Sequence, residues 1–261
     1  MTDTGKYWDR VAREWREGHP QQLWRAHSDA LYRDLLARWL PAAAPGRLLK
    51  TDLFDEAVGE GLYGALAARA STVVGVDLSV ETGGRAHRNH PGLLAVGGDA
   101  RRLPFASDTF DVVFSNSTLD HFDSREEIVE SLREIGRVLR PAGTLLITLD
   151  NLSNPVVALR QVLPFQLLNR LGLLPYRVGA TYRPAGLRRA LEQCGFAVDR
   201  TGAVLHCPRA LVVALARLLE KRGSTRARAR FLRFLGGFEQ LSAWPTRFAT
   251  GYYVAARAVK R

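Results

Sequence analysis

Short runs of apolar residues alternate with amphipathic segments through most of the chain. Short apolar runs suit buried strands, whereas apolar residues at three- and four-residue steps indicate helices. We expect strands at 48–49, 73–76, 93–96, 111–114, 144–149, 196–205 and 250–259. The helices expected between them are 61–70, 80–90, 124–139 and 184–194. Strands and helices that alternate in this way predict a parallel sheet with right-handed crossovers.

The segment 124–139 has the clearest helical pattern. Ser124 and Glu127 form the S-x-x-E arrangement of a capping box, in which each side chain bonds the backbone of the other residue. An apolar stripe then follows at Ile128, Leu132 and Ile135. We therefore expect this helix to begin at Ser124 and to pack one face against the sheet.

Three further regions depart from the strand–helix alternation. Residues 5–40 have a helical pattern, which the sequence Gly-His-Pro at 18–20 divides into two helices. Residues 152–182 combine prolines with many leucines, and 209–241 predict a long helical insertion rich in leucine and arginine. We expect an N-terminal helical segment at 1–45 and one domain at 46–261, with helical insertions at about 152–182 and 207–246.

The net charge of the chain bears on the partners that it could attract. The 261 residues carry a net charge of +11, mostly from arginines spread along the chain, with one concentration at 221–233. Such a charge fits solvated surfaces, but it also attracts nucleic acid, anionic lipid or acidic metabolites. The start of the chain does not resemble a signal peptide, and Cys194 and Cys207 have neither metal-ligand spacing nor a disulfide pattern. We therefore expect a cytoplasmic protein without a metal.

A glycine-rich turn supplies the first candidate site. Gly59, Gly61 and Gly64 are followed by an apolar run that ends at Asp77. Glycines let the backbone approach a ligand closely, and the carboxylate can accept hydrogen bonds from ribose hydroxyls. Asp99 follows the next apolar run and can accept a hydrogen bond from an exocyclic amine such as that of adenine. This layout is typical of a nucleotide-binding βαβ unit.

Several spaced motifs indicate which class of nucleotide-binding protein the chain resembles. They are Val-Gly-Val-Asp at 74–77, Gly-Asp-Ala at 98–100, Leu-Pro-Phe at 103–105, Phe-Asp-Val-Val at 110–113 and Leu-Arg-Pro-Ala-Gly at 139–143. In this order they resemble the class I S-adenosylmethionine-dependent methyltransferases, in particular the small-molecule, type 11-like branch. The resemblance covers about 47–150 and returns weakly near 182–196. It implies a Rossmann-like, doubly wound α/β sheet of about seven strands, mostly parallel with an antiparallel last strand.

The resemblance also implies roles for single residues in binding S-adenosylmethionine. Asp77 is expected to take the two ribose hydroxyls, and Asp99 the adenine amine. The other expected contacts are Leu78 beside the adenine, Ala100 through its backbone, Ser115 near the methionine end, and Gly59 and Gly61 at the backbone approach. As alternatives without a ligand, Asp77 would be a helix cap and Asp99 a turn residue.

One departure from the family pattern concerns its first motif, an acidic residue followed by Gly-x-Gly-x-Gly. Counting back from Gly61 places Asp55 at the acidic position, whereas counting forward from Leu48 places Lys50 there and Asp52 at the first glycine. A segment inserted after the first strand reconciles the two counts. Thr51, Asp52 or Asp55 then contacts the methionine end of the cofactor. Carboxylates there attract its ammonium and sulfonium but repel its carboxylate.

Methyl transfer needs an acceptor and, for a hydroxyl or amine, a general base. His121 follows the fourth strand and is the candidate base, with packing or a cofactor contact as the alternative. Tyr7 and Trp8 resemble the start of relatives in which the N-terminal helix, here within 1–45, is a lid over the cofactor. The apolar and arginine-rich insertions predict a small, apolar or amphipathic metabolite as acceptor, with O-, N- and C-methylation all open.

Other functions remain as alternatives. An NAD-dependent oxidoreductase shares the glycine turn and Asp77, but it leaves Asp99 unexplained. A nucleic-acid methyltransferase would explain the charge, yet residues 115–118 read Ser-Asn-Ser-Thr rather than an N-P-P-Y clamp for adenine. A non-methylating, cofactor-binding member of the fold would explain the unusual segment 50–58. The basic stretch 221–233 either packs on its own domain or contacts an anionic membrane surface. The sequence does not indicate an oligomeric state.

Overall fold

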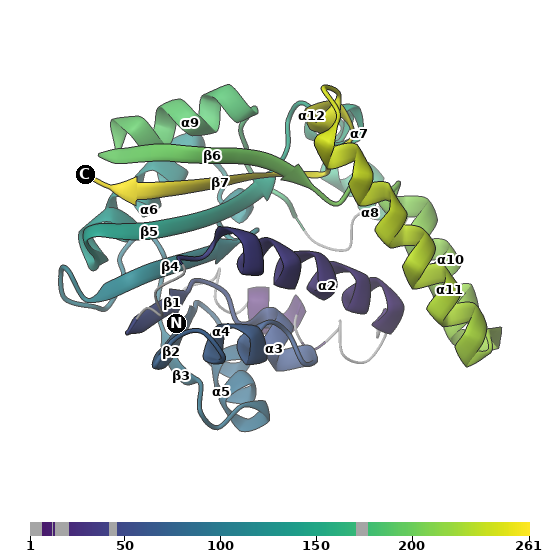
Figure 1. Cartoon of the computed structure of the whole chain (residues 1–261), viewed down its shortest axis with the longest axis horizontal. Coiled ribbons are helices and arrows are strands. Elements are labelled where there is room, and N and C mark those ends of the chain that lie inside the picture. The colour runs from purple at the N-terminus through teal and green to yellow at the C-terminus, as the bar shows by residue number, and fades with distance from the viewer. Residues whose placement is uncertain (1–6, 12, 14–20, 42–45, 171–176) are drawn as a thin grey trace.

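The computed structural model describes residues 7–11, 13, 21–41, 46–170 and 177–261 (Figure 1). Seven strands form one sheet in the order β3-β2-β1-β4-β5-β7-β6. The strands are β1 Arg47–Lys50, β2 Thr72–Asp77, β3 Leu94–Gly97, β4 Phe110–Asn116, β5 Leu139–Asp150, β6 Phe196–Val204 and β7 Tyr253–Lys260. Strands β1 to β5 pair in parallel, and β7 is antiparallel to both β5 and β6. The predicted Rossmann-like sheet is confirmed.

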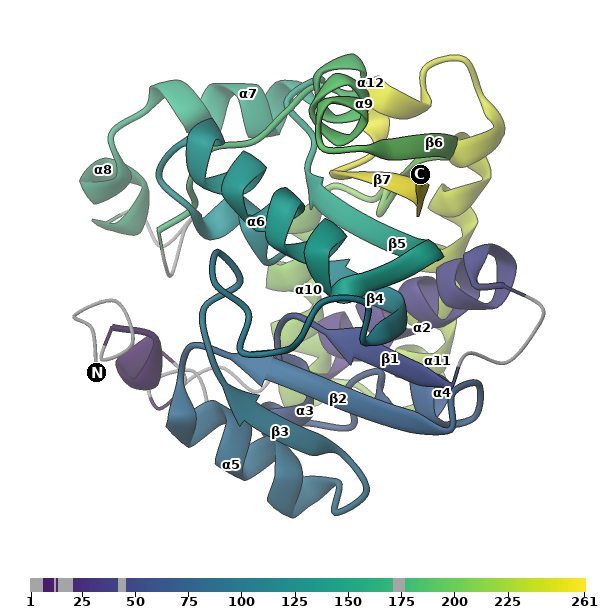
Figure 2. The same ribbon diagram turned by 90° about the vertical axis from the view of Figure 1, so that its left-hand side faces the viewer.

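Helices cover both faces of the sheet (Figure 2). The helices that alternate with the strands along the chain are α3 Phe54–Val58, α4 Tyr63–Ala67, α5 Val80–Asn89, α6 Arg125–Val138 and α9 Pro184–Gln193. Helix α2, Gln22–Trp39, precedes the sheet and lies on the opposite side from α6. Further helices are α7 Pro155–Val162, α8 Phe165–Arg170, α10 Arg209–Arg222, α11 Thr225–Gly237 and α12 Arg247–Thr250, with short 3-10 helices η1 Leu119–His121 and η2 Phe238–Ala243.

Two apolar cores arise because successive strand residues point to opposite faces of the sheet. One core joins Leu48, Val112 and Leu146 of the strands to Trp24, Leu35 and Leu36 of α2. The other joins Leu49, Val113 and Ile147 to Leu132 and Ile135 of α6 and to Leu187 and Leu191 of α9. The sheet is therefore held rigidly from both sides, and its strand ends are fixed in position.

Helix α6 confirms the predicted capping box. Ser124 Oγ accepts a hydrogen bond from the Glu127 N–H, and the Glu127 carboxylate accepts one from the Ser124 N–H. Ile128 is completely buried on the predicted apolar stripe. The strand that follows was predicted to begin at 144, but β5 begins at Leu139, because Leu139 already pairs with Phe110 before a register shift.

The structure adds detail to the predicted pattern at two helical segments. Helix α3 begins four residues after β1 in a stretch for which no helix was predicted. The helical insertion expected at 209–241 consists of two antiparallel helices, α10 and α11, followed by η2 (Figure 1). Gly223 ends α10, and Ser224 caps α11 by accepting a hydrogen bond from the Ala227 N–H. The predicted break at 18–20 lies outside the described residues.

Candidate cofactor site

A cavity of about 270 Å³ lies where the parallel strands end. The loop after β1, the ends of β2 and β4, the segment after β3, helix α2 and the N-terminal segment all contribute to its wall. Strand order reverses between β1 and β4, since the chain passes from β1 outward to β3 and then returns to β4 on the other side. Open α/β sheets bind ligands outside the carboxyl ends of their strands at such a point.

Asp77 and Asp99 lie on this cavity together with Leu78 and Ala100. Asp77 is the last residue of β2, and its carbonyl accepts a hydrogen bond of 3.0 Å from the Gly98 N–H, immediately before Asp99. Parallel pairing of β2 with β3 thus brings both carboxylates to one edge of the sheet. The structure brings together the two acids that the sequence singled out.

The Asp77 carboxylate is held by the backbone. One oxygen accepts the Leu53 N–H at 2.9 Å, and the other accepts the Ser79 N–H at 2.8 Å. Burial, together with the nearby Asp52 carboxylate, raises the pKa of Asp77 to about 7, although these two hydrogen bonds oppose the shift. Asp77 therefore changes protonation near neutral pH.

The Asp99 carboxylate is paired with Arg101. The guanidinium Nη2 of Arg101 lies 2.6 Å from Asp99 Oδ2, and the same group pairs with Glu127 and stacks 5.0 Å from the ring centre of Phe122. Burial favours a higher pKa for Asp99, but the hydrogen bonds from Arg101 outweigh it and lower the pKa. Asp99 is therefore ionised at neutral pH, and a ligand amine has to share or displace the Arg101 contact.

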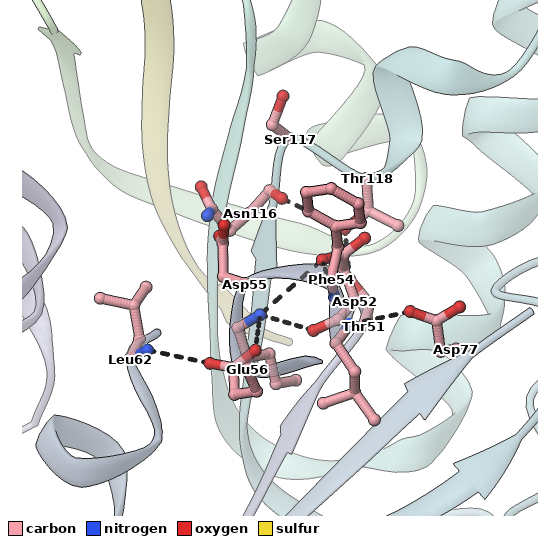
Figure 3. Close-up of polar contacts among 12 residues, drawn as sticks. Thr51, Asp52, Phe54, Asp55, Glu56, Leu62, Asp77, Asn116, Ser117 and Thr118 are labelled. Carbon is pink, nitrogen blue, oxygen red and sulfur yellow. Dashed lines mark hydrogen bonds and ion pairs between the residues drawn. The ribbon is translucent and has the colours of Figure 1, made fainter. Parts of the chain in front are cut away.

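The loop after β1 contains a buried ion pair between Lys50 and Glu56 (Figure 3). Lys50 is the last residue of β1, and its ammonium lies 2.9 Å from Glu56 Oε2. The other oxygen of Glu56 accepts the Leu62 N–H at 2.9 Å. Burial disfavours the charged lysine, but Glu56 and Asp52 outweigh it and raise the pKa of Lys50. Lys50 thus stands where the forward count from Leu48 placed the acidic position, and the carboxylate beside it comes from α3.

Thr51 and Asp52 of this loop and Asp55 of α3, the residues expected at the methionine end, line the cavity. Asp52 accepts a hydrogen bond of 3.0 Å from the Phe54 N–H, and burial raises its pKa although Lys50 opposes the shift. Asp55 pairs with Arg25 of α2 at 3.2 Å. This side of the cavity therefore combines carboxylates with cations inside a small volume.

Three residues expected to bind the cofactor do not line the cavity. Helix α3 separates Gly59 and Gly61 from the end of β1 and so from the cavity. Gly61 instead packs closely on Glu56, since a Cβ added to it would lie 2.8 Å from Glu56 Oε1. Ser115 is fully buried, and its hydroxyl accepts a hydrogen bond of 3.0 Å from Thr51. The next residues, Asn116, Ser117 and Thr118, reach the cavity wall instead.

His121 lies on the cavity wall at the end of η1. Its ring centre is 4.8 Å from that of Trp8, and the two rings meet edge to face. The neighbouring Asp120 accepts the Asp150 N–H at 2.7 Å and the Ser117 hydroxyl at 3.0 Å. Asp9, next to Trp8, accepts a hydrogen bond from the Ser79 hydroxyl. The described part of the N-terminal segment is thereby attached beside Asp77.

Helix α2 lies within the segment 1–45 predicted as a lid, but the sequence did not indicate which of its residues line the cavity. Its cavity-lining residues are Trp24, Arg25, Ser28, Asp29 and Tyr32, with Arg209 of α10 and Tyr253 of β7 beside them. Asp29 is only 8% exposed, and burial followed by the Asp55 charge raises its pKa to about 6. The four-residue spacing of Arg25 and Asp29 was the available signal, but it does not distinguish a cavity wall from a solvated helix face.

Two other kinds of site are not found in the part of the chain that the structure describes. No group of histidine, cysteine and acidic residues there is arranged to hold a metal ion. No helix among the described residues has both the length and the apolar character needed to cross a membrane.

Comparisons with known proteins agree with this geometry. Residues 54–147 match the family model described as "Methyltransferase domain". Demethylmenaquinone methyltransferase of Corynebacterium kroppenstedtii is 40% identical over 106 residues, which are 40% of this chain and 42% of that protein. Fatty-acid O-methyltransferase of Mycolicibacterium smegmatis is 32% identical over 139 residues, 51% of this chain and 50% of that protein. The chain thus spans half or less of the length of these two curated relatives.

A solved structure supports the fold over a longer part of the chain. Geranyl diphosphate C-methyltransferase from Streptomyces coelicolor superposes with a TM-score of 0.59 at 14% identity, covering 89% of this chain and 78% of that one. The sheet order is that of the Rossmann-like methyltransferase fold. Residues 54–147 are similar in sequence to methyltransferase domains. This similarity argues against the NAD-dependent alternative.

Proposed function

We propose that the chain transfers a methyl group from S-adenosylmethionine to a small, apolar or amphipathic metabolite. The observation that carries this proposal is the convergence of Asp77 and Asp99 on one cavity. Two carboxylates at neighbouring strand ends suit a ligand that offers ribose hydroxyls and an adenine amine. The match of residues 54–147 to a methyltransferase domain supports S-adenosylmethionine as that ligand.

In this proposal, different residues of the chain bind different parts of the cofactor. Asp77 holds the ribose, Leu78 lies beside the adenine, and Asp99 with the Ala100 backbone binds the adenine edge. Thr51, Asp52 and Asp55 face the methionine end, where carboxylates attract an ammonium or sulfonium. When bound, S-adenosylmethionine supplies a methyl group that its sulfonium activates. Residues 1–45 act as a lid over the 46–261 domain, which fits the positions of Trp8 and Val11 on the cavity wall.

The proton acceptor for a hydroxyl or amine is proposed to be His121. It lies on the cavity wall, and histidine is the side chain that most often acts as a general base. Asp29 is a second candidate, because it faces the same cavity and its raised pKa of about 6 also suits a base. Once an acceptor is known, the pH dependence of its methylation rate in variants of His121 and Asp29 separates the two. Only replacement of the catalytic base changes that pH dependence.

An apolar or amphipathic acceptor fits the part of the cavity wall that is not assigned to the cofactor. Trp24, Tyr32 and Tyr253 offer aromatic surface, and Arg209 stacks 5.5 Å from the ring centre of Trp24. The names of the two curated relatives indicate acceptors with apolar parts, a demethylmenaquinone and a fatty acid. The free thiols of Cys194 and Cys207 favour the reducing cytoplasm as the location.

Calorimetry with the purified chain tests the cofactor half of the proposal. We expect S-adenosylmethionine and S-adenosylhomocysteine to bind and NAD not to bind. Asp77→Asn removes the charged acceptor for the ribose and should weaken binding by about tenfold or more. Asp34→Asn is the matched control, because Asp34 pairs with Arg38 on the exposed side of α2. A folded chain that takes up neither adenosyl ligand would contradict the proposal.

A further inference from the structure

The helices α10 and α11 form a hairpin that extends beyond the edge of the sheet (Figure 1). Val212 and Ala216 of α10 and Leu235 of α11 are buried, and both helices contact α2. These residues attach the hairpin to the domain through one side. The opposite side of both helices is left without a covering element among the described residues.

Helix α10 carries an exposed apolar stripe. Leu211, Leu215 and Leu218 follow at steps of four and three residues, and their exposed fractions are 58%, 40% and 52%. Such spacing places the three side chains on one face of α10. Phe234 of α11 is 63% exposed. Exposed apolar groups gathered on one feature indicate an interaction surface rather than scattered surface residues.

The same hairpin concentrates positive charge. Its exposed basic residues are Arg217, Lys221 and Arg222 on α10 and Arg226, Arg230 and Arg233 on α11. Glu220 is the single acid between 209 and 237, a fully described range, and its carboxylate accepts a hydrogen bond of 2.7 Å from the Leu23 N–H. The outward charges are therefore not neutralised by acidic residues of the hairpin itself.

A groove between the helices places basic and apolar groups of α11 together. Leu219 of α10 lines it together with Arg226, Arg230, Phe231 and Phe234 of α11. The exposed ring of Phe234 thus lies beside two guanidinium groups. Alkyl and aromatic groups beside guanidinium groups fit a partner that is apolar inside and negatively charged at its surface.

We propose that the uncovered face of the α10–α11 hairpin docks onto an anionic phospholipid bilayer. The leucines and Phe234 enter the boundary between headgroups and acyl chains, while the arginines contact lipid phosphates. A second copy of the chain fits less well, because two such faces would repel each other. Nucleic acid would use the arginines but would leave the leucine stripe in water.

The position of the hairpin relates this docking to the cavity. Arg209, the first residue of α10, lies on the cavity wall, so the docked hairpin would hold the cavity close to the lipid surface. Membrane docking goes beyond the proposed methyl transfer and does not depend on it. Lipid binding can be measured without any adenosyl ligand, so the two proposals fail independently.

Flotation of the full chain with vesicles tests the docking. We expect it to float with vesicles of phosphatidylglycerol and phosphatidylcholine in equal parts, and not with phosphatidylcholine alone. Arg226→Glu combined with Arg230→Glu should weaken the partition by at least about tenfold, because each basic residue near an anionic surface contributes to binding. Added salt should weaken it as well. Leu211→Gln combined with Leu218→Gln should also reduce it, which a purely electrostatic contact would not show.

The matched control is Arg88→Glu combined with Arg189→Glu, which changes the charge equally at exposed positions on α5 and α9. This control should float like the unmodified chain, and circular dichroism should show that all variants are folded. Equal flotation of the hairpin variants and the control would overturn the proposal. So would the absence of flotation, or a dimer in solution that the hairpin variants dissociate, since the face would then belong to a second copy.

Discussion

The ammonium of Lys50 lies 2.9 Å from the carboxylate of Glu56, and both side chains are at most 1% exposed. This pair stands at the end of β1, beneath the loop that lines the proposed methionine end of the site. Neither charge can be removed alone without leaving the other buried, which costs far more than losing a surface ion pair. The loop therefore depends on the pair for its conformation.

Replacing Lys50 tests this dependence. Lys50→Met leaves Glu56 buried without its cation and should lower the free energy of unfolding by about 3–5 kcal/mol. Lys50→Met combined with Glu56→Gln removes both charges but keeps an acceptor for the Leu62 N–H, so it should be more stable than the single variant. Urea unfolding measures both. Arg38→Met, which breaks an exposed pair with Asp34 at 2.6 Å, is the control and should cost less than about 1 kcal/mol.

The raised pKa of Asp77 predicts that cofactor binding is linked to protons. Ribose hydroxyls donate to an ionised carboxylate more strongly than to a neutral one, so binding should lower the pKa from about 7 and release protons near neutral pH. S-adenosylhomocysteine should accordingly bind more tightly as the pH rises through this value. Calorimetry in buffers of different ionisation enthalpy measures the release, and Asp77→Asn should abolish most of it. A release that persists in this variant would mean that another acid titrates.

The raised pKa of Asp77 makes the folded chain less stable as the pH rises, although it makes ligand binding tighter. An aspartate has a pKa of about 3.9 in the unfolded chain, so between about pH 4 and about pH 7 the folded chain holds a proton at Asp77 that the unfolded chain has lost. The contribution of Asp77 to stability is therefore most favourable below about pH 4 and declines as the pH rises to about 7. Asp77→Asn should flatten this part of the stability profile measured by urea unfolding. An unchanged slope would count against the raised pKa.

The ion pair of Asp99 with Arg101 predicts competition for the adenine amine. Asp99→Asn should weaken S-adenosylhomocysteine binding by about tenfold or more, because a charge-assisted hydrogen bond is lost. Arg101→Gln should bind at least as tightly as the unmodified chain, since the guanidinium no longer occupies both Asp99 oxygens. If Arg101→Gln weakened binding as much as Asp99→Asn, Arg101 would itself be a ligand-binding residue.

Trp8 offers a test of the lid. It lies on the cavity wall and meets His121 edge to face, so Trp8→Ala should weaken S-adenosylhomocysteine binding by about threefold to tenfold. Trp244→Ala provides a control of the same residue type, because Trp244 is 58% exposed and does not line the cavity. Equal affinities for the two variants would show that the N-terminal segment does not cover the ligand.

The sequence predicted the strand–helix order well where apolar runs end at a polar residue of known chemistry. Asp77 and Asp99 are of this kind, since parallel pairing places both strand ends at one edge of the sheet. The predicted capping box at Ser124 is likewise confirmed, because it depends only on residues close in the chain.

The loop after β1 could not be predicted in the same way. Glycine spacing placed the ligand contact at Gly59 and Gly61, but α3 occupies the intervening stretch and turns Glu56 back toward Lys50. That contact joins residues through tertiary packing, which no local pattern encodes. Asp29 and Tyr253 were missed for a related reason, because their places on the cavity wall depend on how α2 and β7 lie against the sheet.

The position of β7 has a consequence for how the molecule is assembled. It lies between β5 and β6, so these two strands each lack a neighbour until the last of the seven strands has been synthesised. The parallel half that contains Asp77 and Asp99 has all its pairings available earlier, from β1 to β5. During translation, the adenosyl end of the pocket can therefore fold first, and the wall that includes Tyr253 closes only after residues 253–260 have left the ribosome.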